Sequence, residues 1–183
     1  MLYLIGGAAR TGKTILSERL LKEKNIPYFC LDYLVSAIDR NLHNIPSRQA
    51  AYKILPHLEA MLRNIVEVKS NYIIEGDKLL PELVIKLIRI YPNQIVSCFL
   101  GYSSIDPQEK IKAIKEYPSH INDWTGKLSE VDLKALVTEM SDYSQYIQAE
   151  CYKYNLSYFD TSEDFSNTID KAYQYLIRTH KNI

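Results

Sequence analysis

Residues near the start of the sequence have the types and spacing of a phosphate-binding loop. The pattern G-x-x-x-x-G-K-S/T is matched in full by Gly7, Ala8, Ala9, Arg10, Thr11, Gly12, Lys13 and Thr14. The glycines allow a turn tight enough for backbone N–H groups to converge on phosphate oxygens. A helix that begins at Lys13 directs its N-terminal dipole at the same oxygens. Lys13 supplies a positive charge for the β- and γ-phosphates, and the Thr14 hydroxyl is a ligand for Mg²⁺. These residues therefore predict binding of ATP or another nucleoside triphosphate.

Acidic residues follow two apolar segments that we expect to be strands. Asp32 follows residues 28–31, and Glu75 and Asp77 follow residues 72–74. Open α/β sheets bind ligands at the carboxyl ends of their strands, where these side chains would meet the loop. Carboxylates there can position Mg²⁺ and can orient or deprotonate an acceptor group. Each of these residues also has an alternative interpretation without a function. Asp32 could simply be a helix N-cap, and Glu75 and Asp77 could simply form a turn before the next helix.

The elements that must position these residues alternate between strands and helices. Apolar segments predict strands at residues 2–5, 28–31, 72–74, 95–100 and 157–159. Helical periodicity and capping residues predict helices at 13–24, 33–40, 47–69, 81–91, 106–116, 129–154 and 163–179. This alternation requires a parallel sheet that is covered on both faces, and no linker divides the chain. We therefore expect one α/β domain over residues 1–183.

Two of the expected helices carry specific predictions. In the helix 13–24, the residues expected to face the core are Ile15, Leu16, Leu20 and Leu21. In the helix 47–69, Ser47 is a candidate N-cap, and Pro56 predicts a kink or a break because it cannot donate a backbone hydrogen bond.

Composition excludes several classes of protein. The 22 basic and 22 acidic residues leave a formal net charge of zero, so no broad surface for nucleic acid or an anionic membrane is expected. No apolar run approaches the roughly 20 residues of a membrane span, and the first residues lack the basic region of a signal peptide. The three cysteines have no metal-ligand spacing and are predicted to be reduced thiols. We expect a cytoplasmic protein, whose oligomeric state the sequence does not predict.

The order of these features resembles the small P-loop kinases over nearly the whole chain. That group includes nucleoside monophosphate, shikimate and gluconate kinases and antibiotic phosphotransferases. The resemblance implies a three-layer αβα fold with a five-stranded parallel sheet in the order 2-3-1-4-5. It also implies an acceptor-binding helical segment at residues 33–70 and a lid at residues 105–127. The implied reaction moves the γ-phosphate of Mg·ATP to a small hydroxyl, carboxyl or phosphate acceptor.

The same resemblance implies roles for individual residues. Catalysis would fall to Lys13, Asp32, Glu75 and Asp77, and Mg²⁺ would be held by Thr14 and Asp32. The acceptor would contact Asp32, Arg48, Glu75 and Asp77. An arginine suits a phosphorylated or carboxylated acceptor, although Arg48 is also explained by a solvated helix face. Thr161, which follows the last strand, would lie beside the adenine. Glu75-Gly76-Asp77 lacks the arginine of adenylate kinases and is more similar to 2-phosphoglycerate kinase-like proteins.

The expected lid contains no arginine. Its basic residues are Lys110, Lys112, Lys115, Lys127 and His120. Lysine can neutralise the charge of a transferred phosphate but cannot make the planar bidentate contact of arginine, for which Arg10 is a candidate substitute. The lid therefore leaves an alternative open, in which the chain is a nucleotide-binding regulatory or adaptor protein that hydrolyses ATP slowly.

Overall fold

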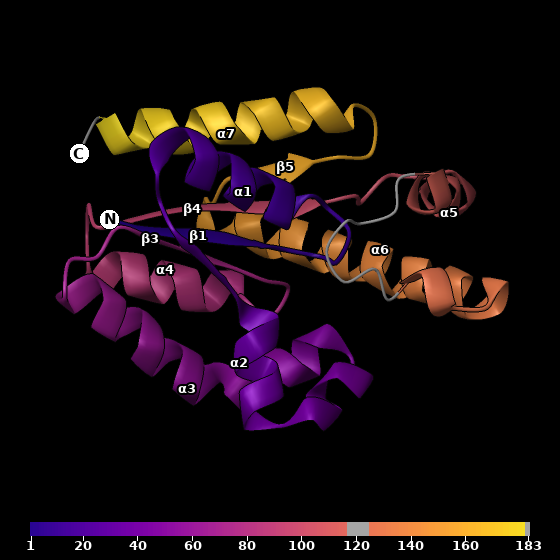
Figure 1. Ribbon diagram of the computed structural model, residues 1–183, viewed down its shortest axis with the longest axis horizontal. Helices are drawn as coiled ribbons and strands as arrows, with labels where there is room; N and C mark the ends of the chain where they lie inside the picture. The colour runs from indigo at the N-terminus through magenta and orange to yellow at the C-terminus, as the bar shows by residue number, and fades with distance from the viewer. Residues whose placement is uncertain (117–124, 182–183) are drawn as a thin grey trace.

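A parallel sheet with the strand order β2-β3-β1-β4-β5 forms the centre of the molecule (Figure 1). It is seen in a computed structural model, which describes residues 1–116 and 125–181. The strands are β1 (Leu2–Gly7), β2 (Tyr28–Cys30), β3 (Tyr72–Glu75), β4 (Ile95–Gly101) and β5 (Tyr158–Asp160). The α/β class and the strand order expected from the sequence are confirmed.

Helices cover both faces of this sheet (Figure 1). One face carries α1 (Lys13–Lys24) and α7 (Phe165–Lys181). The other face carries α3 (Ser47–Glu67), α4 (Pro81–Ile90) and α6 (Glu130–Tyr154). The remaining elements are α2 (Leu31–Ile38), α5 (Pro107–Glu116) and the 3₁₀ helices η1 (Arg40–Asn44) and η2 (Thr125–Lys127). Within residues 1–116 and 125–181, no helix combines the length and the apolar character needed to cross a membrane.

The central strand β1 supplies side chains to both hydrophobic cores. Every residue of β1 is buried, as expected for a parallel strand covered on both faces. Leu2 and Leu4 pack toward α3, α4 and α6, whereas Tyr3 and Ile5 pack toward α1 and α7. This alternation follows from the two-residue period of a strand. Truncating a fully buried leucine of this kind to alanine typically costs about 2–5 kcal/mol, so β1 is a rigid base for the loop that follows it.

The strand register brings three carboxyl ends together. Ile5 of β1 lies opposite Glu75 of β3, and Glu75 lies opposite Cys30 of β2. The loop that follows Gly7 and the helix that follows Cys30 therefore begin at the same edge of the sheet as Glu75. This edge is where open α/β sheets bind ligands.

The structure corrects two expectations about buried faces and helix breaks. In α1, Leu16 and Leu20 are buried, but Ile15 and Leu21 are 52% and 40% exposed, so the inward face is narrower than expected. Of the kink or break expected at Pro56, the break is wrong, because α3 runs through this residue. Pro56 lies on the solvent side of α3 while Ile54 is fully buried, so water can satisfy the carbonyl that the proline leaves unpaired.

Ser47 does not cap α3. The N-cap position is taken by Pro46, and Ser47 is the first residue of the helix. Its hydroxyl is buried and donates to the carboxylate of Asp77. A long-range contact has therefore replaced the local one that the sequence predicts.

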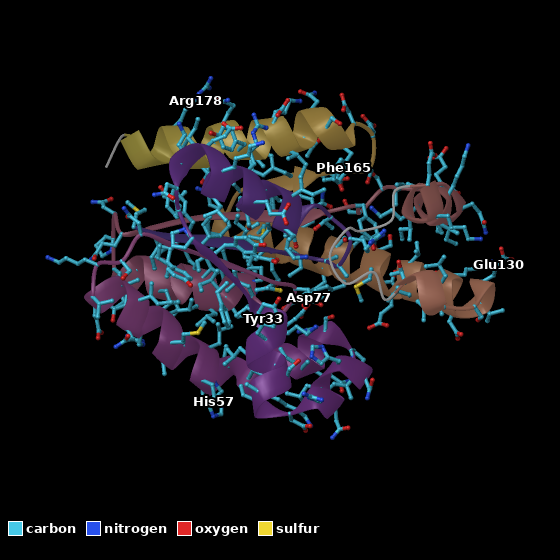
Figure 2. The ribbon with its side chains drawn as sticks, viewed as in Figure 1. Tyr33, His57, Asp77, Glu130, Phe165 and Arg178 are labelled. Atoms are coloured by element: carbon cyan, nitrogen blue, oxygen red, sulfur yellow. The ribbon has the colours of Figure 1, made fainter. Side chains whose placement is uncertain are left out.

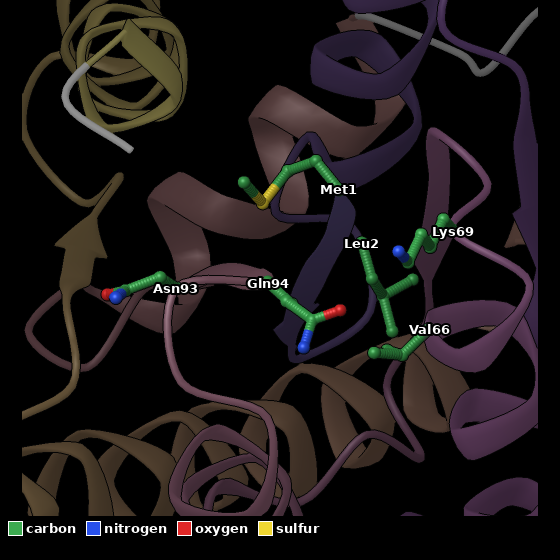
Figure 3. A pocket seen from close by; sticks show the side chains of 6 residues that line it. All are labelled: Met1, Leu2, Val66, Lys69, Asn93 and Gln94. Atoms are coloured by element: carbon green, nitrogen blue, oxygen red, sulfur yellow. The ribbon is translucent and has the colours of Figure 1, made fainter.

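A hollow of about 220 Å³ lies at the opposite edge of the sheet (Figure 3). It is lined by Met1, Leu2, Val66, Lys69, Asn93 and Gln94, which lie at the ends of helices or the starts of strands. None of the predicted site residues lies in it. We therefore place the candidate site at the carboxyl edge, where the loop and the acidic residues meet.

Candidate active site

The loop between β1 and α1 needs glycine at both ends. Gly7 has a φ of 120°, and a Cβ atom there would lie 1.8 Å from the carbonyl oxygen of Leu100. Gly12 has a φ of 93°, and a Cβ atom there would lie 2.8 Å from side-chain atoms of Phe165 and Ile169. A side chain at either position would force the loop outward. The tight turn that phosphate binding requires is therefore built into the backbone.

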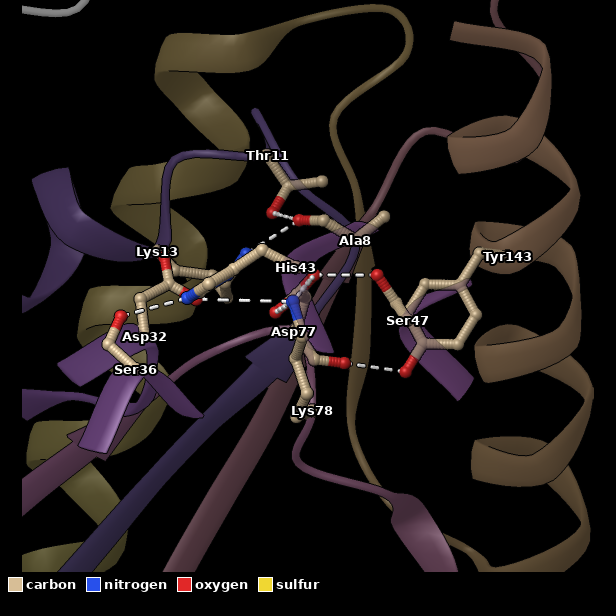
Figure 4. A network of polar contacts seen from close by, with 10 residues as sticks. All are labelled: Ala8, Thr11, Lys13, Asp32, Ser36, His43, Ser47, Asp77, Lys78 and Tyr143. Atoms are coloured by element: carbon tan, nitrogen blue, oxygen red, sulfur yellow. Dashed lines mark hydrogen bonds and ion pairs between the residues drawn. The ribbon is translucent and has the colours of Figure 1, made fainter. Parts of the chain in front are cut away.

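Lys13 points back across this loop (Figure 4). Its side chain is buried, and its Nζ donates to the carbonyl oxygen of Ala8 at 2.6 Å. The Thr11 hydroxyl donates to the same oxygen at 2.9 Å. The ammonium thus rests on a neutral carbonyl, and a charge-assisted bond to an anion would be stronger. A phosphate in the loop would draw Lys13 away from Ala8.

Thr14 and Glu75 form a pair of oxygen donors beside Lys13. The Thr14 hydroxyl donates to Glu75 Oε1 at 3.1 Å. Glu75 is 2% exposed, and this burial raises its pKa, although Lys13 and hydrogen bonds from Cys30 and Thr14 oppose the shift. Mg²⁺ in nucleotide sites is bound by one or two carboxylates together with phosphates and waters. A hydroxyl and a carboxylate in contact fit that ligand set.

The carboxylate of Asp77 is held inside the protein (Figures 2 and 4). It accepts hydrogen bonds from Ser47 Oγ at 2.8 Å and from Lys78 Nζ at 2.9 Å. Its main-chain carbonyl accepts a bond from the Tyr143 hydroxyl at 2.6 Å. Burial alone would raise the pKa of Asp77, but Lys78, Lys13 and these bonds bring it below its ordinary value. Asp77 therefore fixes β3 to α3 and α6 and carries the ion pair with Lys78.

Asp32 has the opposite environment. It lies in the first turn of α2, and its side chain is 57% exposed. Its Oδ1 lies 4.0 Å from Lys78 Nζ, so Lys78 stands between the exposed and the buried carboxylate. The N-cap of α2 is Cys30, so Asp32 is not the N-cap, although the first turn of a helix does favour a carboxylate. Its carboxylate faces solvent at the edge where the loop lies.

Two predicted residues lie apart from this group. The Arg48 guanidinium covers the ring of Tyr146 at 4.2 Å, which places Arg48 on the surface between α3 and α6. Thr161 follows β5 at the other side of the sheet, and both its N–H and its hydroxyl donate to the carbonyl oxygen of Gly101. The structure therefore gathers Lys13, Thr14, Asp32 and Glu75 but not these two.

Lys78 belongs to the site and was not among the predicted residues. It is 7% exposed and separates Asp77 from Leu79 and Leu80, which are fully buried. Its pKa is raised, because Asp77 and Asp32 outweigh the opposing effect of burial. The sequence did contain a signal for this residue, because Lys78 directly precedes two leucines that could be buried. A lysine that is buried with them requires an ionic partner nearby.

The α5 helix of the expected lid contacts the loop. Lys110 is 6% exposed, its Nζ donates to the carbonyl oxygen of Arg10 at 2.9 Å, and it lies over the ring of Tyr102 at 4.1 Å. In return, Arg10 Nη2 donates to the carbonyl oxygen of Ile114 at 3.4 Å. Lys112 is exposed. His120 lies outside the described residues.

No family model and no curated protein matches the sequence. Solved structures match nearly all of it. A gluconokinase from Sinorhizobium meliloti 1021 has a TM-score of 0.64 at 15% identity, covering 98% of this chain and 93% of that chain. A shikimate kinase from Bacteroides thetaiotaomicron has a TM-score of 0.58 at 14% identity, covering 97% and 98%. A deoxyadenosine kinase from M. mycoides has a TM-score of 0.57 at 12% identity, covering 97% and 100%. The chain therefore has the fold of the small P-loop kinases.

Proposed function

We propose that the chain is a phosphotransferase that moves the γ-phosphate of ATP to a small-molecule acceptor. A fold alone hosts many functions, so the proposal rests on the site. The observation that carries it is the Lys13 ammonium, which lies inside a complete phosphate-binding loop and rests on the carbonyl of Ala8. The Thr14–Glu75 pair and the exposed carboxylate of Asp32 lie at the same edge of the sheet.

The loop side of the site would bind the nucleotide. Backbone N–H groups of residues 7–14 and the N-terminus of α1 would hold the phosphates, and Lys13 would contact the β- and γ-phosphates. Thr14 and Glu75 would hold Mg²⁺, with Asp32 acting through water, and the ion would neutralise charge on the transferred phosphate. Because Lys13 is already buried and aimed into the loop, little reorganisation is needed during transfer.

The other side would bind the acceptor. Asp32 is the carboxylate best placed to accept a proton or a hydrogen bond from it, because it is exposed and close to Lys78. Asp77 would act through Lys78, whose ammonium it holds at 2.9 Å, and is therefore a positioning residue. Residues 33–70 would form the acceptor wall, where Arg48 would meet an anionic group on the acceptor. Thr161 and its backbone would lie beside the adenine, and the reaction would take place in the cytoplasm.

One observation favours a second candidate function. The expected lid at 105–127 has no arginine, and α5 is bonded to the loop through Lys110 and Arg10. A nucleotide-binding regulatory protein that hydrolyses ATP slowly would use such a contact to report the nucleotide state.

The proposal is tested by ADP release from Mg·ATP with a panel of acceptors. The panel contains phosphoglycerates, sugar acids, nucleosides, nucleoside monophosphates, and aminoglycoside and amphenicol antibiotics. We expect one class to stimulate ADP release many-fold in the wild type and not in Lys13→Ala. A slow rate that no acceptor changes, with ATP still tightly bound, would favour the regulatory protein.

A further inference from the structure

The middle of the phosphate-binding loop contains a strained residue. Arg10 has a φ of 61°, in the left-handed region that residues with a Cβ atom avoid. The conformation costs roughly 1–2 kcal/mol for such a residue and persists only where its surroundings hold it. Asn25, Asn93 and Asn155 also have positive φ, but asparagine tolerates this region well. Lys69 has positive φ too, but it directly follows the C-cap of α3, where a left-handed residue commonly ends a helix. Arg10 therefore requires a physical explanation from its contacts.

Two contacts of Arg10 lead to α5, one from its main chain and one from its side chain. The carbonyl oxygen of Arg10 accepts a bond from Lys110 Nζ at 2.9 Å. The Arg10 guanidinium donates to the carbonyl oxygen of Ile114, one turn further along α5, at 3.4 Å. We call this reciprocal pair the loop clasp. It fixes both the backbone and the side chain of the strained residue against one helix.

Burying the ammonium of Lys110 costs free energy, so we look for an interaction that compensates for this cost. Its Nζ has a main-chain carbonyl as its hydrogen-bond acceptor and the ring of Tyr102 beneath it. Burial lowers the pKa of Lys110, and charge repulsion from Arg10 and Lys13 adds to this effect, so that the pKa is about 8. The helix α6 packs against α5 through apolar side chains. A polarised ammonium in this environment makes a stronger bond to the Arg10 carbonyl than it would in water.

We propose that Lys110 is a positioning residue of the nucleotide site, which holds Arg10 in its left-handed conformation and so keeps the loop N–H groups directed at the phosphates. This rests on the proposed function only in requiring that the loop binds a nucleoside triphosphate. The clasp also couples the loop to α5, so that movement of this helix changes the shape of the loop. Lys110 therefore acts on the phosphates through the backbone of Arg10.

The test is a double-mutant cycle on Mg·ATP affinity, measured by titration calorimetry. Lys110→Met removes the bond to the carbonyl, while Arg10→Gly removes the backbone strain that the bond opposes. We expect Lys110→Met to weaken binding about tenfold in the wild-type background and no more than about twofold in the Arg10→Gly background. Lys134→Met, which removes an exposed lysine of α6 outside the expected lid, is the matched control and is expected to bind like the wild type.

The pH dependence provides a second readout. The protonated ammonium makes the stronger bond, so wild-type affinity is expected to fall as the pH rises through 8, more steeply than in the double variant. Titration of the nucleotide phosphates is common to both proteins and cancels in this comparison. Thermal unfolding of each variant identifies a folding defect, and Lys110→Arg, which keeps a cation, is then expected to restore most of the affinity.

Three results would overturn the proposal. The first is an equal loss of affinity from Lys110→Met in both backgrounds. The second is a Mg·ATP affinity of Lys110→Met that equals that of Lys134→Met. The third is the same pH dependence of affinity for the wild type and the double variant. The first would mean that Lys110 acts on the nucleotide directly or only on the fold. A wild-type protein that binds Mg·ATP but transfers no phosphate would instead contradict the proposed function. The double-mutant cycle would still test the role of Lys110, because it measures only Mg·ATP affinity.

Discussion

The two halves of the candidate site hold their cations differently. On the loop side, Lys13 and Lys110 donate to the neutral carbonyls of Ala8 and Arg10. On the acceptor side, Lys78 is paired with the carboxylates of Asp77 and Asp32. A cation on a carbonyl gains strongly from an arriving anion, whereas a cation between two carboxylates is already neutralised. This difference fits the proposed function, in which the loop side would bind phosphate and the other side would bind an acceptor through Asp32.

Two carboxylates that stand two residues apart show the same contrast. Glu75 faces Thr14 and the loop, and its pKa is raised by burial. Asp77 faces Ser47 and Lys78, and its pKa is lowered despite burial. Under the proposed function, the same chemical group would have two uses, Glu75 at the bound nucleotide and Asp77 in holding the structure. Substitutions on the two sides should separate activity from stability.

The largest effect is expected from Lys13→Ala. Removing the ammonium from the loop should lower kcat/KM for the stimulating acceptor by about 10³-fold, because an electrostatic contact to the transferred phosphate is lost. The measurement is steady-state ADP release, and Lys24→Ala at the exposed end of the same helix is the control. Equal rates of ADP release by Lys13→Ala and Lys24→Ala would contradict the role of the loop side in binding phosphate.

Glu75→Gln should have the next largest effect, about 10²-fold in kcat, because a neutral amide is a poor partner for Mg²⁺. Only the ionised carboxylate of Glu75 would bind Mg²⁺. Because burial raises the pKa of Glu75, acidification should remove the activity at a higher pH than it would for an ordinary glutamate. The acid limb of kcat/KM for Mg·ATP against pH, which reports the ionisable groups of the free enzyme, should therefore be absent from Glu75→Gln. An unchanged acid limb in that variant would assign it to another group.

Asp77→Asn should act on stability, whereas Asp32→Asn should act on activity. Removing the buried carboxylate leaves Lys78 with only the exposed carboxylate of Asp32 at 4.0 Å and should cost about 3 kcal/mol of unfolding free energy. Because the folded pKa of Asp77 is lowered, its contribution is present above the ordinary aspartate pKa and is lost as the pH falls through the folded value. Urea unfolding at neutral and acidic pH measures both effects. A larger stability loss from Asp32→Asn would reverse the assignment.

Arg48→Ala should have the smallest effect. Arg48 is exposed and rests on the ring of Tyr146, so the fold should tolerate its removal. We expect KM to rise a few-fold for acceptors that carry a carboxylate or phosphate and to stay unchanged for uncharged ones. A rise for both kinds of acceptor would mean that Arg48 shapes the surface rather than recognising charge.

The loop and most helix limits follow from the sequence because they depend on local patterns. The strand order was expected only from the resemblance to the small P-loop kinases. The motif at 7–14 determines where β1 ends and α1 begins, and α1 has the predicted bounds of Lys13–Lys24. Apolar runs mark the buried strands well, since both faces of a parallel sheet are covered.

The contacts across the fold could not be predicted in the same way. Ser47 has the local signature of a cap but bonds to Asp77, thirty residues away. Lys110 is one of several lysines in its segment, and only the packing of α5 on the loop distinguishes it from exposed Lys112. Such choices depend on tertiary distances, which spacing along one chain does not reveal.

The most direct test of the central claim follows the γ-phosphate to its destination. Wild-type protein is incubated with γ-labelled Mg·ATP and the acceptor that best stimulates ADP release, and labelled product and labelled inorganic phosphate are both measured. The account predicts one labelled acceptor for each ADP, with little inorganic phosphate, and no transfer by Lys13→Ala. Inorganic phosphate equal to ADP with every acceptor would contradict it and identify the chain as a slow ATPase.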